Sequence, residues 1–237
     1  MNLTPADLDT EIYRIVSFKR FKELFETRRN TLVTPAQWDD PFENFILKCP
    51  VRLATGELAH IDFHDRYFGQ CWTLNRASDA MWRIYSPNKD GIRMRTTIRR
   101  LAESLSSQTG EWSAVSTFIG RVQYLSRRRL EALAKDAFAR LDPQHFARTL
   151  LVKRPAFEHE REIRLIYHKP DASPNREKFF SYSIDPDSLI TQVMCDPRQT
   201  DAEYRAIREA IHRVGYRGSI KHSLLYAPPP RFELRFK

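Results

Sequence analysis

Apolar and polar residues alternate most clearly in the third quarter of the chain. Apolar side chains recur at every second position over 163–167, which predicts a strand, and we expect that strand over 157–168. Residues two apart in a strand share a face and lie roughly 6.6–7 Å apart. We therefore expect Glu160, Glu162 and Arg164 to stand in a row on one side of a sheet. Such a row is either a solvated sheet face or a functional site.

The same patterns predict further strands and several helices along the chain. Ser17 precedes a run with apolar residues at helical spacing, and Thr200 with Glu203 forms a capping box at the head of another helix. Further strands are expected at 11–17, 31–34, 69–75, 91–96, 120–125, 179–184, 190–195 and 216–220. The strands outnumber the helices between them, so the sequence predicts an α+β fold: a mostly antiparallel mixed sheet with flanking helices, as a single domain over 1–237.

Composition restricts the class of protein. Hydrophobic residues make up 41% and charged residues 29%, which is typical of globular proteins. No apolar run approaches the ~20 residues that span a bilayer, and no secretory pattern opens the chain, so no membrane partner is expected. The three cysteines, Cys49, Cys71 and Cys195, are far apart and odd in number. We therefore expect neither a disulfide framework nor a zinc site, and a reducing cytoplasm fits best.

The basic excess points to phosphate-bearing partners. A formal charge of +9 favours nucleic acid or a nucleotide cofactor, although ordinary solubility explains it about as well. The chain has only seven glycines and neither of the glycine-rich phosphate-binding motifs. A phosphate would therefore have to be held by side chains.

Two clusters have both a structural and a functional interpretation. Residues 38–43 (Trp-Asp-Asp-Pro-Phe-Glu) are typical of a turn in which Asp40 bonds the backbone ahead of it, and the structural interpretation is the stronger. Met81, Trp82 and Tyr85 follow the strand that ends near Thr73. At helical spacing these side chains are more often core residues, but a Trp and a Tyr beside a strand end also stack on flat rings.

The first strand contributes a third cluster. Alternation places Tyr13 on one face and Arg14 on the other, between Ile12 and Val16. An arginine on an apolar face is costly unless it is paired or binds an anion. It either forms a buried ion pair with one of the glutamates or recognises a phosphate, for which guanidinium geometry is suited.

Taken in order, these segments resemble a bacterial family known only as a domain of unknown function, DUF2971. Shared features are Tyr-Arg on an early strand, an Asp-Pro-Phe-Glu turn, Met-Trp-x-x-Tyr, and Phe-x-x-Glu-x-Glu-x-Arg, between about Tyr13 and Tyr226. Asp39 replaces the family's Asn, and Phe157 replaces its Trp or Tyr. The arginines of Ile92-Arg93-Met94-Arg95 also depart from the family's apolar strand.

A looser resemblance is to the ADP-ribosyltransferases, which pair an Arg or His on the first strand with a Glu on a later one. Arg14 and Glu160-Arg161-Glu162 have that order. The resemblance implies an NAD-dependent transferase, which could be a toxin or phage-defence effector acting on nucleic acid, with an antitoxin or other protein partner. Glu162 would stabilise positive charge on the ribose, and Glu160 would accept a proton from the nucleophile. NAD, as substrate, would contact Tyr13, Arg14, Thr73, Met81, Trp82, Tyr85 and Arg164.

Two other function classes stay open. Glu160 and Glu162 with Asp40 or Asp79 could hold Mg²⁺ in a metal-dependent nuclease. Arg164 stands where that pattern usually has a Lys, and it cannot give up a proton. In a non-enzymatic nucleic-acid or protein binding module, the same charges would form cross-strand pairs.

Overall fold

The computed structural model describes residues 1–38, 40–43, 45–48, 50–52, 55–59, 66–140, 142–172 and 177–226. Asp39 and Cys49 lie outside these ranges. Helices within them are α1 (Phe18–Thr27), α2 (Phe45–Lys48), α3 (Asp79–Tyr85), α4 (Ile98–Thr109), α5 (Ser113–Ser116), α6 (Arg127–Arg140), α7 (Pro143–Thr149), α8 (Pro186–Leu189) and α9 (Asp201–Arg213). Strands are β1 (Glu11–Ser17), β2 (Arg29–Val33), β3 (Val51–Arg52), β4 (Leu58–Ala59), β5 (Tyr67–Thr73), β6 (Gly91–Thr97), β7 (Thr117–Arg121), β8 (Gln123–Tyr124), β9 (Val152–Lys153), β10 (Glu162–His168), β11 (Phe179–Ser183), β12 (Gln192–Cys195) and β13 (Ser219–Lys221).

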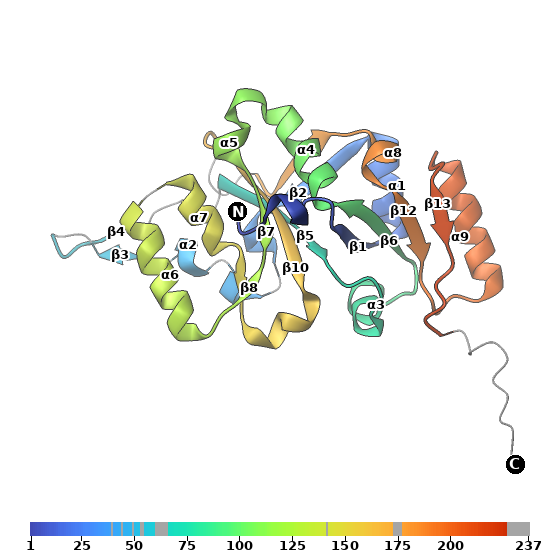
Figure 1. Ribbon diagram of the computed structural model, residues 1–237, viewed down its shortest axis with the longest axis horizontal. Helices are drawn as coiled ribbons and strands as arrows, with labels where there is room; N and C mark the ends of the chain where they lie inside the picture. The colour runs from blue at the N-terminus through green and yellow to red at the C-terminus, as the bar shows by residue number, and fades with distance from the viewer. Residues whose placement is uncertain are drawn as a thin grey trace, which may run out of the picture.

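A central sheet organises the molecule, with helices around it (Figure 1). Its strands run in the order β11-β2-β5-β1-β6-β12-β13, and β10 pairs with both β5 and β7. The pairs within this sheet are antiparallel apart from β12 with β13. The α+β architecture expected from the sequence is therefore confirmed.

The sheet opens at β5. This strand pairs with β10 over its whole length, from Glu162↔Thr73 to His168↔Tyr67. On its other side, the described residues pair it with β1 only at Tyr13↔Thr73 and with β2 only at Val33↔Gly69. The strands on that side diverge from β5, which leaves side chains of β1 and β5 facing an opening rather than a closed ladder.

Local sequence signals explain several element boundaries. Ser17, Ser78 and Thr97 cap α1, α3 and α4, because each side-chain oxygen accepts a hydrogen bond from a backbone N–H in the first turn. The expected capping box of Thr200 and Glu203 opens α9. The main core lies on the sheet face that carries Ile12, Trp72 and Ile163, together with apolar residues of α1, α4 and α9. No helix in the described ranges is both long and apolar enough to cross a bilayer.

Several strand boundaries differ from the prediction by a few residues, as at β7, β12 and β13, and the start of β10 differs most. The strand expected from residue 157 begins at Glu162, and Pro155–Glu160 form a 3₁₀ helix instead. Arg161 then takes a left-handed conformation, with φ of 46°, and turns the chain into β10. Glu160 is therefore not on the strand, although Glu162 and Arg164 are.

Candidate active site

Glu162 and Arg164 form the base of the site on β10. Arg164 Nε donates a hydrogen bond to Glu162 Oε2 at 2.7 Å, and Arg164 Nη2 lies 2.6 Å from the same oxygen in an ion pair. It also donates from Nη1 to the Leu150 carbonyl oxygen at 2.8 Å. The Arg164 side chain is 0% exposed. It thus acts as a fixed support behind Glu162.

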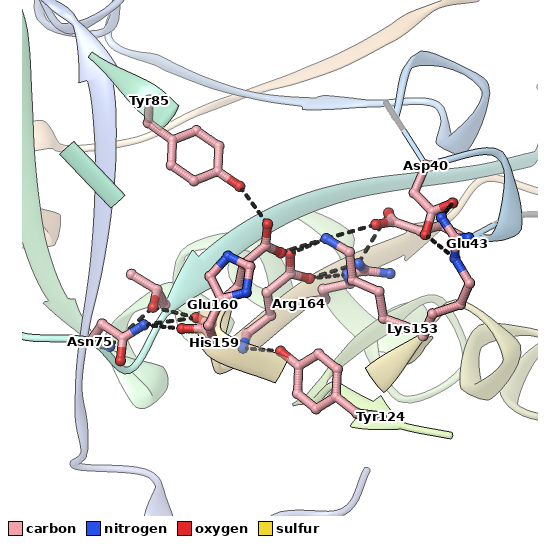
Figure 2. Close-up of polar contacts among 12 residues, drawn as sticks. Asp40, Glu43, Asn75, Tyr85, Tyr124, Lys153, His159, Glu160 and Arg164 are labelled. Carbon is pink, nitrogen blue, oxygen red and sulfur yellow. Dashed lines mark hydrogen bonds and ion pairs between the residues drawn. The ribbon is translucent and has the colours of Figure 1, made fainter. Parts of the chain in front are cut away.

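Glu160 reaches Glu162 from the 3₁₀ helix rather than along the strand. Its carbonyl oxygen accepts a hydrogen bond from Thr73 Oγ1 at 2.5 Å, and the His159 carbonyl oxygen accepts one from Asn75 Nδ2 at 2.7 Å. These contacts fasten the turn to the end of β5 (Figure 2). The turn therefore brings the Glu160 carboxylate beside that of Glu162 although the two residues do not share a strand face.

Lys153, at the end of β9, joins three buried carboxylates. Its Nζ lies 2.5 Å from Glu160 Oε2, 3.2 Å from Glu162 Oε1 and 2.9 Å from Glu43 Oε1. Figure 2 shows the Lys153 ammonium between Glu43 on one side and Glu160 on the other. Arg164 Nη2 also contacts Glu43 Oε2 at 3.1 Å. Two cations, Lys153 and Arg164, are thus in ion pairs with three carboxylates.

The packing of Trp38 helps to position Glu43 beside Lys153 and Arg164. The Trp38 ring packs on β5 at Gly69, where an added Cβ would lie 2.5 Å from the ring, and the Arg164 guanidinium lies 4.4 Å from the ring centroid. Asp40 accepts a hydrogen bond from the Phe42 backbone N–H at 3.0 Å, as the turn chemistry indicated. The turn therefore has its expected structural role, and it also places the Glu43 carboxylate beside Lys153.

The two catalytic candidates differ in proton affinity. Burial would raise the pKa of Glu162, but Arg164, a hydrogen bond with Glu160, and Lys153 together lower it to about 2. Burial and the hydrogen bond with Glu162 raise the pKa of Glu160 despite Lys153. Glu162 is accordingly the stronger acid of the two, and Glu160 is the carboxyl that binds a proton more readily.

A cavity of about 140 Å³ faces these carboxylates. It is closed on one side by α3, from which Tyr85 donates a hydrogen bond to Glu160 Oε1 at 3.4 Å. Seven of the nine residues singled out in the sequence line this cavity. They are Tyr13, Arg14, Thr73, Met81, Tyr85, Glu160 and Glu162, and the other lining residues are Ile15, Cys71 and Trp72.

Trp82 and Arg164 lie elsewhere. Trp82 is 1% exposed and packs with Ile15 and Met81, so its side chain serves the core, as the helical spacing favoured. Arg164 is shielded by Glu162 and Glu43 and does not reach the cavity. The expectation that both contact NAD does not fit their positions, because neither side chain has a surface that a ligand could touch.

Arg14 lies at the opening between β1 and β5. It is half-buried, and burial lowers the pKa of its guanidinium. Ile12 and Val16 belong to the core side of β1, so the strand face of Arg14 is apolar, as the alternation indicated. No ion pair or hydrogen bond joins Arg14 to any residue in the described ranges, so of the two alternatives the pairing with a glutamate is not seen there. Arg14 also borders a second cavity, of about 340 Å³.

Sequence reasoning did not assign Lys153, Glu43 or Tyr124 to the site. Tyr124 Oη accepts a hydrogen bond from the Glu162 backbone N–H at 3.0 Å and so fixes the start of β10. Lys153 stands a few residues before the Glu-x-Glu segment, and the turn that contains Glu43 is itself a family motif. Those two motifs were the available signal, but nothing in the sequence showed that they meet.

The acidic residues proposed for a metal site are engaged by cations. Arg154 lies 3.0 Å from Asp40, and Arg83 lies 2.7 Å from Asp79. Over the described ranges, no group of three His, Cys, Asp or Glu is arranged to hold a metal ion. Asp40 and Asp79 are thus each held in an ion pair with an arginine.

Comparisons with known proteins agree with the family resemblance. The family described as "Protein of unknown function (DUF2971)" matches residues 81–165, which confirms that resemblance. No curated protein matches. Solved structures of DarT from Thermus sp. 2.9 are similar at low identity. The complex with ADP-ribosylated ssDNA has 12% identity and a TM-score of 0.43, covering 91% of this chain and 94% of DarT. The NAD⁺ complex has 14% identity and a TM-score of 0.39, covering 90% and 96%. A likeness of this degree does not assign an activity.

Proposed function

We propose that this chain is an NAD-dependent transferase of the ADP-ribosyltransferase kind. One observation carries the proposal: Arg14 and Glu162 line the same cavity, and Arg14 has no ion pair or hydrogen bond with another described residue. A half-buried guanidinium without a counter-ion is a suitable partner for a phosphate. A firmly held carboxylate that lines the same cavity is a suitable partner for a developing sugar cation.

The proposed reaction breaks the bond between the ribose C1′ and the nicotinamide nitrogen. Nicotinamide leaves with the bonding electrons, and positive charge develops on the ribose. Ionised Glu162 stabilises that charge more in the transition state than in the ground state. The acceptor then forms a bond to C1′ and gives its proton to Glu160, whose raised pKa makes it the stronger base of the two carboxylates.

The space around Arg14 suits a substrate with two parts. The cavity of about 140 Å³ has room for a ring-sized group rather than a dinucleotide. Met81 and Tyr85 of α3 line it and would hold the nicotinamide end. Since Arg14 borders both this cavity and the one of about 340 Å³, a pyrophosphate at Arg14 would leave the adenosine end in the larger space.

We further propose nucleic acid as the acceptor, which the formal charge of +9 supports. A role as a toxin or phage-defence effector, restrained in the cytoplasm by an antitoxin or another protein, follows as the biological setting of such chemistry. Induced expression in a bacterial host checks this setting. Growth arrest that is lost with Glu162→Gln supports it, and normal growth at confirmed expression of folded protein speaks against it.

The enzymatic proposal is tested with NAD⁺ that carries a label in its adenosine half. The protein is incubated with this NAD⁺ and with single-stranded DNA, RNA or a cell lysate, with and without EDTA. We expect nicotinamide release and label transfer that EDTA leaves unchanged. Neither release nor transfer with any acceptor would count against the proposal. Nucleic-acid cleavage that requires Mg²⁺ or Mn²⁺ would favour the nuclease instead.

A further inference from the structure

A continuous row of side chains crosses the sheet from the candidate catalytic site. The strand registers align Glu162 with Thr73, Thr73 with Tyr13, and Tyr13 with Arg95. Side chains at directly opposed positions point to the same sheet face. Neighbouring strands lie ~4.7–4.9 Å apart, so the Arg95 backbone is about 14 Å from that of Glu162. Tyr13 stands between the carboxylates and the basic end of this row.

Arg93 lies two residues before Arg95 on β6 and shares that face. It is 5% exposed, and its guanidinium lies 4.7 Å from the centroid of the Tyr13 ring. Nη1 donates to the Arg76 carbonyl oxygen, but buried Nε has no hydrogen-bond partner. A buried donor without a partner and a charge without a counter-ion are both costly, so the protein retains Arg93 against an energetic penalty.

The nearby carboxylate does not compensate for Arg93. Glu11 pairs with Arg95 at 2.7 Å and accepts a hydrogen bond from Tyr13 Oη at 2.7 Å. Arg76, on the exposed loop after β5, has no ion pair with any residue in the described part of the chain. Arg93 thus lies near two further arginines, Arg76 and Arg95, and near one carboxylate, Glu11, which is paired with Arg95. Burial lowers the pKa of the Arg93 guanidinium, and Arg76 and Arg95 lower it further, so an anion placed among them would relieve a real repulsion.

We propose that Arg76, Arg93 and Arg95 form a phosphate-binding site for the backbone of a single-stranded nucleic-acid acceptor. The proposal rests on the proposed function for its biological meaning, since it positions an acceptor strand along the row that ends at Glu162. The cofactor's pyrophosphate is the other source of phosphate. It is the weaker candidate because Arg14 lines the carboxylate cavity, whereas none of these three arginines is among the residues that line it.

The test measures binding of a fluorescent single-stranded oligonucleotide by anisotropy, without NAD, at several salt concentrations. Arg76→Gln is chosen because Arg76 is exposed, and Arg93→Lys keeps the charge while removing the planar guanidinium. Arg127→Gln is the matched control, because the Arg127 side chain is 90% exposed and lies on α6. We expect Arg76→Gln to weaken binding about tenfold and to make the log–log salt dependence shallower by about 0.7. Arg127→Gln should change neither quantity.

Three outcomes separate this site from the proposed function. Oligonucleotide affinity that is the same in Arg76→Gln, Arg93→Lys and the unaltered protein would overturn the site, even if the protein transfers ADP-ribose. A raised KM for NAD⁺ in acceptor-free cleavage, with unchanged oligonucleotide binding, would also overturn it and assign the arginines to the cofactor. The protein could instead bind the oligonucleotide in a way that depends on Arg76 and yet not cleave NAD⁺. That result would support the phosphate-binding site and contradict only the proposed enzymatic function.

Discussion

Arg14 and Glu162 line one cavity, yet the two charges are held in opposite ways. Glu162 is bound by Arg164 and Lys153, whereas no ion pair joins Arg14 to any described residue. A charge out of water and without a counter-ion lowers stability unless a ligand supplies the opposite charge. This difference distinguishes Glu162, whose charge is neutralised within the fold, from Arg14, whose charge has no ion pair among the described residues.

Replacing Arg14 should therefore harm function without harming the fold. Arg14→Met removes a half-buried charge and keeps most of the aliphatic volume, so we expect the free energy of unfolding to stay the same or rise by about 1 kcal/mol. NAD⁺ cleavage should fall at least tenfold, because one charged hydrogen-bonding partner is lost. Urea denaturation and a nicotinamide-release assay measure the two effects. A loss of stability of about 3 kcal/mol would instead identify Arg14 as a structural charge.

Lys153 should behave in the opposite way. Lys153→Met leaves Glu43, Glu160 and Glu162 buried with one cation, and breaking such a network costs about 3–5 kcal/mol of unfolding free energy. Lys22→Met is the control, since the Lys22–Glu26 pair is about half exposed and should change stability by less than about 1 kcal/mol. Equal stabilities of the two variants in urea would show that the Lys153 network is not a structural support.

Acid should destabilise the protein partly through Glu162. Its pKa of about 2 in the folded state lies below its ordinary value of 4.5, so the ionised carboxylate stabilises the fold above about pH 4.5. That contribution, on the order of 3 kcal/mol, is lost as the pH falls towards 2. Glu160 acts in the opposite sense, because its raised pKa makes protonation favour the folded state.

Urea midpoints of the unaltered protein and Glu162→Gln measure this effect. The stability advantage of the unaltered protein should be largest near neutral pH and shrink below about pH 4.5. An advantage that is constant from neutral pH down to about pH 3 would contradict the lowered pKa of Glu162.

Thr73 should affect activity through the position of Glu160. Its hydroxyl donates to the Glu160 carbonyl oxygen and accepts from the Asn75 backbone N–H at 3.0 Å. Thr73→Val leaves both groups without this partner, which should cost about 1–3 kcal/mol of stability and lower kcat. Thr73→Ser keeps the hydroxyl and should retain kcat. A Thr73→Ser variant as impaired as Thr73→Val would show that the methyl group, and not the hydrogen bonds, matters.

The sequence predicted those parts of the site that depend on local periodicity. Alternation along β10 placed Glu162 and Arg164 on one face, and alternation along β1 placed Arg14 among apolar neighbours, because a strand repeats every two residues. Helical spacing correctly favoured a core position for Trp82.

The remainder of the site depends on contacts between distant segments. The turn that carries Glu160 is fixed by Thr73 and Asn75, more than eighty residues earlier, and alternation alone continued the strand through it. Glu43 reaches Lys153 because Trp38 packs on Gly69, a contact that no periodicity encodes. The strand registers place Arg14 and Glu162 on opposite faces of the sheet, and only the opening between β1 and β5 shows how one cavity borders both.

The central claim is that Glu162 stabilises the charge that develops when NAD⁺ is cleaved. The most direct measurement is the rate of nicotinamide release by the unaltered protein and by Glu162→Gln, with Glu209→Gln as a control at a glutamate whose side chain is 73% exposed. We predict measurable release by the unaltered protein and by Glu209→Gln, and a loss of at least about a hundredfold in folded Glu162→Gln. Release that is equal in all three proteins, or in none above background, would contradict the account.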